Sequence, residues 1–381
     1  MKKILIISHS ANLYGSEKSL LDYLIHSKSN SSLLFEVWVP STGPLIDRLK
    51  EVGFKVKIFG FKRWINNGKS GAGIFHYLMN MMALIWSAYS FLKFKPDLIY
   101  SNSLSNPFGL YLARMYKTKH IWHIREFIEE DIGAQFDFGK INSMRLAGSY
   151  TDLFICNSLA TSQKWNKYSK KEYRVIYNGF DFDLDRDIKA CLEKQANQVV
   201  FKLLIASSIQ SGKGIQDGIN VMLLLKESGL NCTLTIIGSV EDKSYYLKLR
   251  QFCEEKGLED CIKWRGYSNH LIEEFDSHSV LIIPSRCEAF GRIAVEAMAV
   301  GLPVIATKAG GLTEIVEDGE TGFLYQPEDI VALEACIKKV QGQSELVAKI
   351  VEAAHADVIR RFSMSLYIDE LTQTFESVLN S

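Results

Sequence analysis

Two glutamates and a glycine between positions 288 and 296 have the residue types and spacing best suited to binding and chemistry. Glu288 closely follows the apolar run VLIIPS, at the carboxyl end of a predicted parallel strand, where open α/β sheets bind ligands. At Gly291 the chain enters the helical pattern RIAVEAMAV, and the first N–H groups of a helix suit an anion such as a diphosphate. Glu296 lies about one and a half turns into that helix, where it could reach the ribose of a nucleotide or be an ordinary surface acid.

Lys213, in the segment ASSIQSGKGIQDGI, is a second candidate for contact with phosphate. The segment predicts a strand, a loop and a helix, and a flexible cation there could stabilise the charge that develops on a leaving diphosphate. The alternative is a lysine in a solvated surface loop. The segment is not a P-loop, because Gly214 rather than Ser or Thr follows the lysine.

His123 and Arg125 end the apolar run HIWHIRE. Residues two apart lie on the same face of an extended strand, so either side chain could point toward a substrate. A lone histidine is more often structural, and the sequence leaves both possibilities open.

Short apolar runs alternate with helical patterns along the chain, which predicts parallel sheets with helices on both faces. A first series runs from KILIIS at 3–8 to LFICNS, and a second begins with VVFKLLIASS at 199–208. The length of 381 residues exceeds the size at which one hydrophobic core keeps growing, so we expect two α/β domains. The polar segment 181–198 is the predicted connection.

The composition is that of an ordinary soluble globular protein. The seven cysteines are scattered without zinc-ligand spacing, and the first apolar run is too short for a signal peptide, so we expect reduced thiols, no bound metal and a cytoplasmic location.

Residues 1–185 hold 24 basic and 16 acidic residues, whereas 186–381 hold 20 and 28. The basic first half favours a phosphate-bearing partner or an anionic membrane surface, or it serves solubility alone. We expect no nucleic-acid partner.

The longest uncharged run, at 74–92, approaches the roughly 20 residues that span a bilayer. It contains polar residues and leads directly into the strand DLIYSNS, as a crossover helix of a parallel sheet does. We interpret it as a buried helix, with membrane contact and a membrane span as the alternatives. The loop at 61–71, FKRWINNGKSG, combines three cations with a tryptophan, which suits an anionic membrane interface or a solvated loop.

The flanks of the two glutamates resemble, in order, the signature of family 4 glycosyltransferases, members of the GT-B superfamily. Weaker similarities extend over most of the chain, including Tyr14-Gly15-Ser16-Glu17 and Ile236-Ile-Gly238. The signature segments are Glu288-Ala-Phe-Gly291, Glu296-Ala-Met-Ala, Gly301-Leu-Pro-Val-Ile305, Gly310-Gly311-Leu-Thr-Glu-Ile-Val and Asp318-Gly-Glu-Thr-Gly322.

This resemblance implies two Rossmann-like domains that face each other across a cleft. The acceptor-side domain would cover 1–185 and the donor-side domain 186–361, and residues 362–381 would form a helix that packs back on the first domain. The oligomeric state stays open.

The resemblance also implies roles for single residues. Glu288 would contact hydroxyls of the transferred sugar, Glu296 the ribose, and Lys213 the phosphates. His123 or Arg125 would face the sugar from the first domain. The other positions that match donor-binding segments are Ala289, Phe290, Gly291, Gly15, Ser208 and Gly238.

Ser208 is a departure from the family pattern, because many members have an arginine five residues before the lysine that corresponds to Lys213. The serine leaves one fewer fixed charge for a diphosphate. Arg292 and Lys308 are the candidate replacements.

The activity that the resemblance implies is that of a retaining glycosyltransferase without cofactor or metal. It would transfer a hexose or N-acetylhexosamine from a nucleotide-diphosphate sugar, with a UDP-sugar favoured, to a glycan or lipid-linked glycan in cell-surface polysaccharide biosynthesis. Peripheral contact with the inner face of the cell membrane is an additional expectation. The alternatives are a nucleotide-sugar epimerase of the same fold and a catalytically silent subunit that binds nucleotide-sugar.

Overall fold

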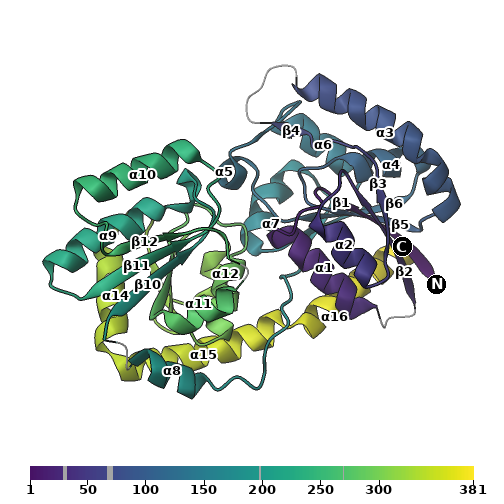
Figure 1. The fold of residues 1–381 in the computed structure, drawn as a ribbon. Helices are drawn as coiled ribbons and strands as arrows, with labels where there is room; N and C mark the ends of the chain where they lie inside the picture. Colours follow the sequence, from purple (N-terminus) through teal and green to yellow (C-terminus); the bar gives the residue numbers. More distant parts are fainter. Residues whose placement is uncertain (29–31, 67–71, 197–198, 269) are drawn as a thin grey trace. The chain divides into compact units, whose positions relative to one another are not determined.

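The chain forms two compact α/β units in a computed structural model. Unit 1 combines Met1–Asp181 with Phe362–Ser381, and unit 2 is Phe182–Arg361. The predicted change of domain, at 185, lies beside the division after Asp181. The described residues are 1–28, 32–66, 72–196, 199–268 and 270–381 (Figure 1).

Unit 1 is built on a seven-stranded sheet with the strand order β3-β2-β1-β5-β6-β8-β9. All neighbouring strands in it are parallel, as the alternation of apolar runs and helical patterns predicts. Two short strands, β4 and β7, form a separate antiparallel pair. The strands are β1 Lys2–Ser8, β2 Leu33–Val39, β3 Lys55–Ile58, β4 Ile65–Asn66, β5 Leu98–Asn102, β6 Lys119–Ile124, β7 Gln135–Phe136, β8 Leu153–Cys156 and β9 Glu172–Val175.

Helices cover both faces of this sheet, because successive side chains of a strand point to opposite sides. Ile4 and Ile6 of β1 pack in a cluster with α1, α2 and α16, whereas Leu5 and Ile7 pack in a cluster with α3 and α4. The helices are α1 Gly15–Ser27, α2 Pro44–Glu51, α3 Ala72–Phe94, α4 Phe108–Tyr116, α5 Glu129–Ile132, α6 Lys140–Tyr150, α7 Leu159–Trp165, the 3₁₀ helix η1 Asn166–Tyr168, and α16 Met364–Asn380.

The last helix, α16, completes the core of unit 1. Its buried side chains belong to the same hydrophobic cluster as those of α1 and β1. The ring of Phe375 lies edge-on to Tyr23 and Tyr100, with centroid distances of 6.1 and 5.3 Å. The final residues of the chain are therefore part of the fold of the first unit.

Helix α3 contains the uncharged run 74–92, and its interpretation as a buried helix is wrong. Only one side of α3 is buried, and nine large hydrophobic side chains along it are exposed. The helix packs on one neighbouring surface, where Ala83, Leu84 and Phe91 join the cluster and Met81 and Phe94 pack against it. No helix among the described residues is long and apolar enough to cross a membrane.

The neighbouring loop at 61–71 does not present its tryptophan to the surface. Trp64 is 2% exposed; its indole N–H donates to the carbonyl of Leu104 at 2.7 Å and its ring stacks on Trp122. Lys62 and Arg63 are exposed, while Lys69 lies outside the described residues.

Unit 2 is built on a six-stranded parallel sheet with the strand order β12-β11-β10-β13-β14-β15. Counted within the unit, this is the order 3-2-1-4-5-6 of doubly wound nucleotide-binding domains. The strands are β10 Phe201–Ala206, β11 Cys232–Ile237, β12 Ile262–Arg265, β13 Val280–Ile283, β14 Val304–Thr307 and β15 Phe323–Tyr325.

The helices of unit 2 lie on both faces of its sheet (Figure 1). Side chains of α9, α10 and α14 join the main hydrophobic cluster of the unit, and α12 contacts β13 and β14. The segment 181–198 contains a helix of its own, α8, which the sequence analysis did not predict. The helices are α8 Ile188–Ala196, the 3₁₀ helix η2 Ser211–Lys213, α9 Ile215–Glu227, α10 Lys243–Glu255, α11 Leu271–Ser277, α12 Arg292–Ala299, α13 Leu312–Ile315, α14 Ile330–Gly342 and α15 Ser344–Phe362.

The packing of α16 predicts that Phe375→Ala strongly destabilises unit 1. Removal of a fully buried phenylalanine ring is expected to lower the free energy of unfolding by about 3–5 kcal/mol. Leu366→Ala, at an exposed position of the same helix, is the control and should cost less than about 1 kcal/mol. Urea unfolding measures both, and equal costs would show that α16 does not pack as described.

Candidate functional site

The strand order of unit 2 brings two loops together that are far apart in sequence. β10 and β13 are neighbours in the sheet, with Leu203 beside Val280, although they are separated by β11 and β12 along the chain. The order of strands reverses between them, and in open α/β sheets this point at the carboxyl ends of the strands is where ligands bind. Lys213 lies in the loop after β10, and Glu288 in the loop after β13.

Lys213 and Glu288 form an ion pair at this point. The Lys213 Nζ donates to Glu288 Oε2 at 2.8 Å, and the side chains are 19% and 21% exposed. Both side chains are therefore accessible to a ligand and yet partly shielded from water, which strengthens their electrostatic interaction. The structure brings together two residues that the sequence analysis selected separately.

Close backbone contacts hold the two loops together. The N–H of Arg286 donates to the carbonyl of Gly212 at 2.9 Å. Gly214 has a φ of +63°, and a Cβ there would lie 1.9 Å from the carbonyl oxygen of Pro284. Only glycine allows this approach, which explains why one directly follows Lys213.

A second glycine contact supports the loop that carries Glu288. The N–H of Gly311 donates to the carbonyl of Glu288 at 2.8 Å, and a Cβ on Gly311 would lie 2.6 Å from the carbonyl oxygen of Phe290. Ala289 and Phe290 are buried in the same loop. The Gly310-Gly311 pair of the signature thus positions the segment 288–291.

Helix α12 begins directly after this loop. Gly291 is its N-cap, with a φ of 107°, and has no side chain with which to cap the helix. The positive end of the helix dipole therefore lies next to Glu288 and is suited to an anion. Glu296, further along α12, accepts a hydrogen bond from Arg292 Nη2 at 3.2 Å.

The other predicted donor-binding positions of unit 2 follow neighbouring strands. Ser208 lies after β10, and its hydroxyl accepts a hydrogen bond from Gln210 at 3.0 Å. Gly238 follows β11, and a Cβ there would lie 1.9 Å from the carbonyl oxygen of Ser207. Both positions therefore border the same edge of the sheet as Lys213.

Arg286 is a cation of this region that the sequence analysis missed. Its guanidinium lies 3.2 Å from the Cβ position of Gly214 and forms two hydrogen bonds with the buried carboxylate of Asp217, one of them 2.7 Å long. The two proposed replacements for the family arginine also have acidic partners, because Arg292 binds Glu296 and Lys308 lies 3.4 Å from Asp318. The only sequence signal for Arg286 is its position just after the apolar strand VLIIPS.

His123 and Arg125 lie in unit 1 and are both buried. His123 Nδ1 lies 2.6 Å from the hydroxyl of Tyr100, and its Nε2 has no hydrogen-bond partner among the described residues. Burial and the neighbouring Arg125 hold the pKa of His123 well below its usual range, so the imidazole is neutral. A neutral ring that accepts at Nδ1 carries its proton on Nε2.

Arg125 connects several elements of unit 1. Its guanidinium donates to Asn102 at 2.7 Å, to Asn178, and to the hydroxyl of Tyr367 in α16 at 2.9 Å. With these bonds the side chain ties the ends of β5 and β9 to the last helix. The side chains of His123 and Arg125 therefore belong to a hydrogen-bonded network inside the unit.

Gly15 begins α1 at the carboxyl end of β1, next to a contact between Glu17 and His9 that the sequence analysis did not select. Glu17 is fully buried, and its carboxylate lies 3.2 Å from His9 Nε2. The Asn102 side chain at the end of β5 also donates to the carbonyl of Ser16 at 3.2 Å. β1 and β5 are neighbours at which the strand order of unit 1 reverses, so Gly15 occupies the same topological position in unit 1 as Lys213 in unit 2.

Glu126 is a buried carboxylate next to Arg125. It accepts hydrogen bonds from the Ser103 hydroxyl and from the backbone N–H groups of Ser105 and Arg125, the latter two at 3.1 and 3.0 Å. Burial raises its pKa to about 7 in spite of these bonds.

Among the described residues, no group of three or more His, Cys, Asp or Glu side chains is placed to hold a metal ion.

Residues 193–357, which contain the Lys213–Glu288 pair, match the family model "Glycosyl transferases group 1". The chain is 34% identical over 165 residues to a D-inositol 3-phosphate glycosyltransferase of Paenarthrobacter aurescens, covering 41% of this chain and 40% of that protein. It is 27% identical over 210 residues to the capsular polysaccharide biosynthesis glycosyltransferase CapM of Staphylococcus aureus, covering 53% of each chain. The chain thus spans about half the length of the curated relatives it matches.

The fold of the entire chain is similar to that of Anabaena Alr3699/HepE, whose crystal structure was solved in complex with UDP-glucose. The TM-score is 0.80 at 23% sequence identity, and the match covers 99% of this chain and 100% of that one.

The raised pKa of Glu126 predicts a pH-dependent stability of unit 1. A carboxyl that binds its proton more tightly when folded stabilises the fold below about pH 4.5, and this contribution is lost as the pH rises through about 7. Glu126→Gln removes the titration, so its free energy of unfolding relative to the wild type should rise by up to about 3 kcal/mol between these pH values. Chemical unfolding across this range measures the difference, with Glu130→Gln as the control. A constant difference between Glu126→Gln and the wild type would refute the raised pKa.

Proposed function

We propose that the chain is a retaining glycosyltransferase that uses a UDP-sugar. Residues 193–357 match the family model of glycosyl transferases group 1, and the chain has the GT-B fold. The observation that carries the proposal is the contact between Lys213 and Glu288 at the adjoining ends of β10 and β13. A cation and a carboxylate at this point can bind the two halves of a nucleotide-diphosphate sugar.

Each half of the donor has a chemically suitable partner in unit 2. Lys213 and the N-terminal end of α12 offer positive charge to the diphosphate. Glu288 can accept hydrogen bonds from sugar hydroxyls, and Glu296 from the ribose. UDP is favoured as the nucleotide because the structurally similar Anabaena protein was solved with UDP-glucose.

In the proposed reaction, the bond between the anomeric carbon and the diphosphate breaks, and a bond from the acceptor hydroxyl oxygen forms on the same face of the sugar. The hydroxyl proton passes to the departing phosphate oxygen. Lys213 and the dipole of α12 stabilise the negative charge on the leaving group, so the proposal requires neither a metal ion nor a cofactor. Glu288 orients the sugar and forms no covalent intermediate.

We further propose that the acceptor is a glycan or a lipid-linked glycan of cell-surface polysaccharide synthesis, and that the transferred sugar is a hexose or N-acetylhexosamine. The similarity to CapM, a capsular polysaccharide glycosyltransferase, supports this pathway. The excess of eight positive charges in residues 1–185 is compatible with an acceptor that carries a diphosphate.

The proposal predicts that Glu288→Ala and Lys213→Ala each lower turnover of the preferred donor about 10²- to 10³-fold, because each removes a preorganised electrostatic contact. Hydrolysis and transfer should be measured with a panel of nucleotide-sugars in the presence of EDTA. Thermal shift with each donor reports binding, since a ligand at a hundred times its Kd adds about 2.7 kcal/mol of stability.

Glu345→Ala and Lys349→Ala, at exposed positions of α15 in the same unit, are the charge-matched controls and should keep wild-type turnover. The anomeric configuration of the product, measured by NMR, tests retention. Isomerised donor without transfer would identify an epimerase, and binding without turnover a silent subunit. A requirement for added metal would contradict the proposed stabilisation by Lys213 and α12.

A further inference from the structure

The burial pattern of α3 differs from that of a usual surface helix, which keeps its polar side chains outside. Two polar side chains lie on the buried side together with Ala83, Leu84 and Phe91: Asn80 makes two hydrogen bonds with the backbone of Lys62, and Ser87 donates to the carbonyl of Leu84. Nine large apolar side chains are exposed on the rest of the helix, with Ile85 73% and Trp86 65% exposed. Such a contiguous apolar surface indicates an interaction site.

The exposed side chains form a continuous stripe along the helix. Their spacing of three or four residues places them on one side of an α-helix over roughly 27 Å, at 1.5 Å per residue. We call this surface the α3 stripe; it consists of Ile74, Leu78, Met82, Ile85, Tyr89 and Leu92.

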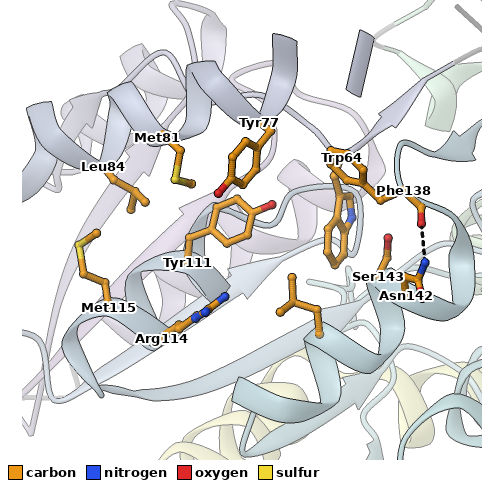
Figure 2. A pocket seen from close by; sticks show the side chains of 11 residues that line it. Trp64, Tyr77, Met81, Leu84, Tyr111, Arg114, Met115, Phe138, Asn142 and Ser143 are labelled. Carbon is orange, nitrogen blue, oxygen red and sulfur yellow. Dashed lines mark hydrogen bonds between the residues drawn. The ribbon is translucent and has the colours of Figure 1, made fainter. Parts of the chain in front are cut away.

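A pocket of about 740 Å³ opens directly beside the stripe. Figure 2 shows Tyr77, Met81 and Leu84 of α3 lining one wall, with Tyr111 and Met115 of α4 opposite. Trp64 and Leu84 are buried, whereas Met115 and Tyr77 are exposed. The pocket is therefore apolar inside and open toward the surface that carries the stripe.

Cations lie near the C-terminal end of this apolar surface and beside the pocket, while Asp137 contacts His76 near the N-terminal end of α3. Lys93 lies in the last turn of α3 with its ammonium group 5.9 Å from the ring of Tyr89, and Arg114 lines the pocket. Lys117 follows Tyr116, whose ring stacks on Phe91 of α3 at 4.1 Å.

We propose that the α3 stripe docks on an anionic lipid bilayer and that the pocket beside it takes a hydrocarbon chain of a bilayer lipid. An apolar helix face with flanking cations is the pattern of helices that lie in the membrane interface. The cations attract anionic headgroups, while the outward apolar side chains enter the region of the acyl chains. The buried side of α3 stays bonded to unit 1, so the helix lies along the membrane surface.

A bilayer fits this surface better than a second copy of the chain. Protein interfaces are depleted in lysine, and two identical surfaces of like charge repel each other when they meet. The inference rests on unit 1 alone and is independent of the proposed function.

Flotation with phosphatidylcholine vesicles, with and without phosphatidylglycerol, tests the docking. The full chain should bind the vesicles that contain phosphatidylglycerol, less at high salt, and the double variant I85E/W86E should bind at least about tenfold less. Val331→Glu, at an exposed apolar position of α14 in unit 2, is the control and should bind like the wild type. Glu288→Ala should also bind like the wild type, which separates this inference from the catalytic proposal.

Quenching of tryptophan fluorescence by phospholipids with brominated acyl chains tests the pocket. Quenching should persist in Trp86→Phe, because Trp64 lines the pocket, and fall in the double variant W64F/W86F. Loss of all quenching in Trp86→Phe would overturn the pocket assignment. Absence of vesicle binding, unchanged binding by I85E/W86E, or a dimer in solution that I85E/W86E dissociates would overturn the docking.

Discussion

The order of the parallel strands is the constraint on which the rest of the candidate site depends. Because β10 and β13 are neighbours, two loops 75 residues apart in sequence end at the same edge of the sheet. These two loops approach most closely at Gly214, where a side chain would clash with Pro284, and Gly311 in the loop after β14 supports the loop that carries Glu288. The ion pair of Lys213 and Glu288 is therefore a consequence of topology and of two glycines that permit close backbone approach.

The sequence predicted the elements of this site better than its contacts. Glu288 could be placed from its position after an apolar run, because the end of a parallel strand is a fixed structural location. Its pairing with Lys213 could not be predicted, since a contact between residues that are distant in the sequence depends on which strands become neighbours. Arg286 was missed for the same reason: its partner Asp217 lies on a helix after another strand. The sequence left open whether His123 or Arg125 contacts a substrate. Strand alternation places both side chains on the same face of the strand, but it gives no information on what covers that face.

Helix α3 shows a second limit of sequence reasoning. The hydrophobicity of the run 74–92 predicted burial, but a run that is apolar on all sides does not define which face is inside. The polar residues contained the missing information, because Asn80 and Ser87 are seven residues apart and so lie on one side of the helix. In the structure that side is the buried one, with both side chains hydrogen-bonded. The polar residues were used as an argument against a membrane span, whereas their spacing, which identifies the buried side, was not used.

The charges around Lys213 set a condition on how the proposed donor could bind. Arg286 and Lys213 have Asp217 and Glu288 as partners, so neither cation offers a full unbalanced charge. A diphosphate that attracts Lys213 weakens its bond to Glu288, and a partly buried carboxylate that loses its partner costs free energy. The hydroxyls of an attached sugar can donate to Glu288 and offset that cost. Binding of the two halves of the donor would then be coupled through one ion pair, which favours the intact nucleotide-sugar over the nucleotide alone.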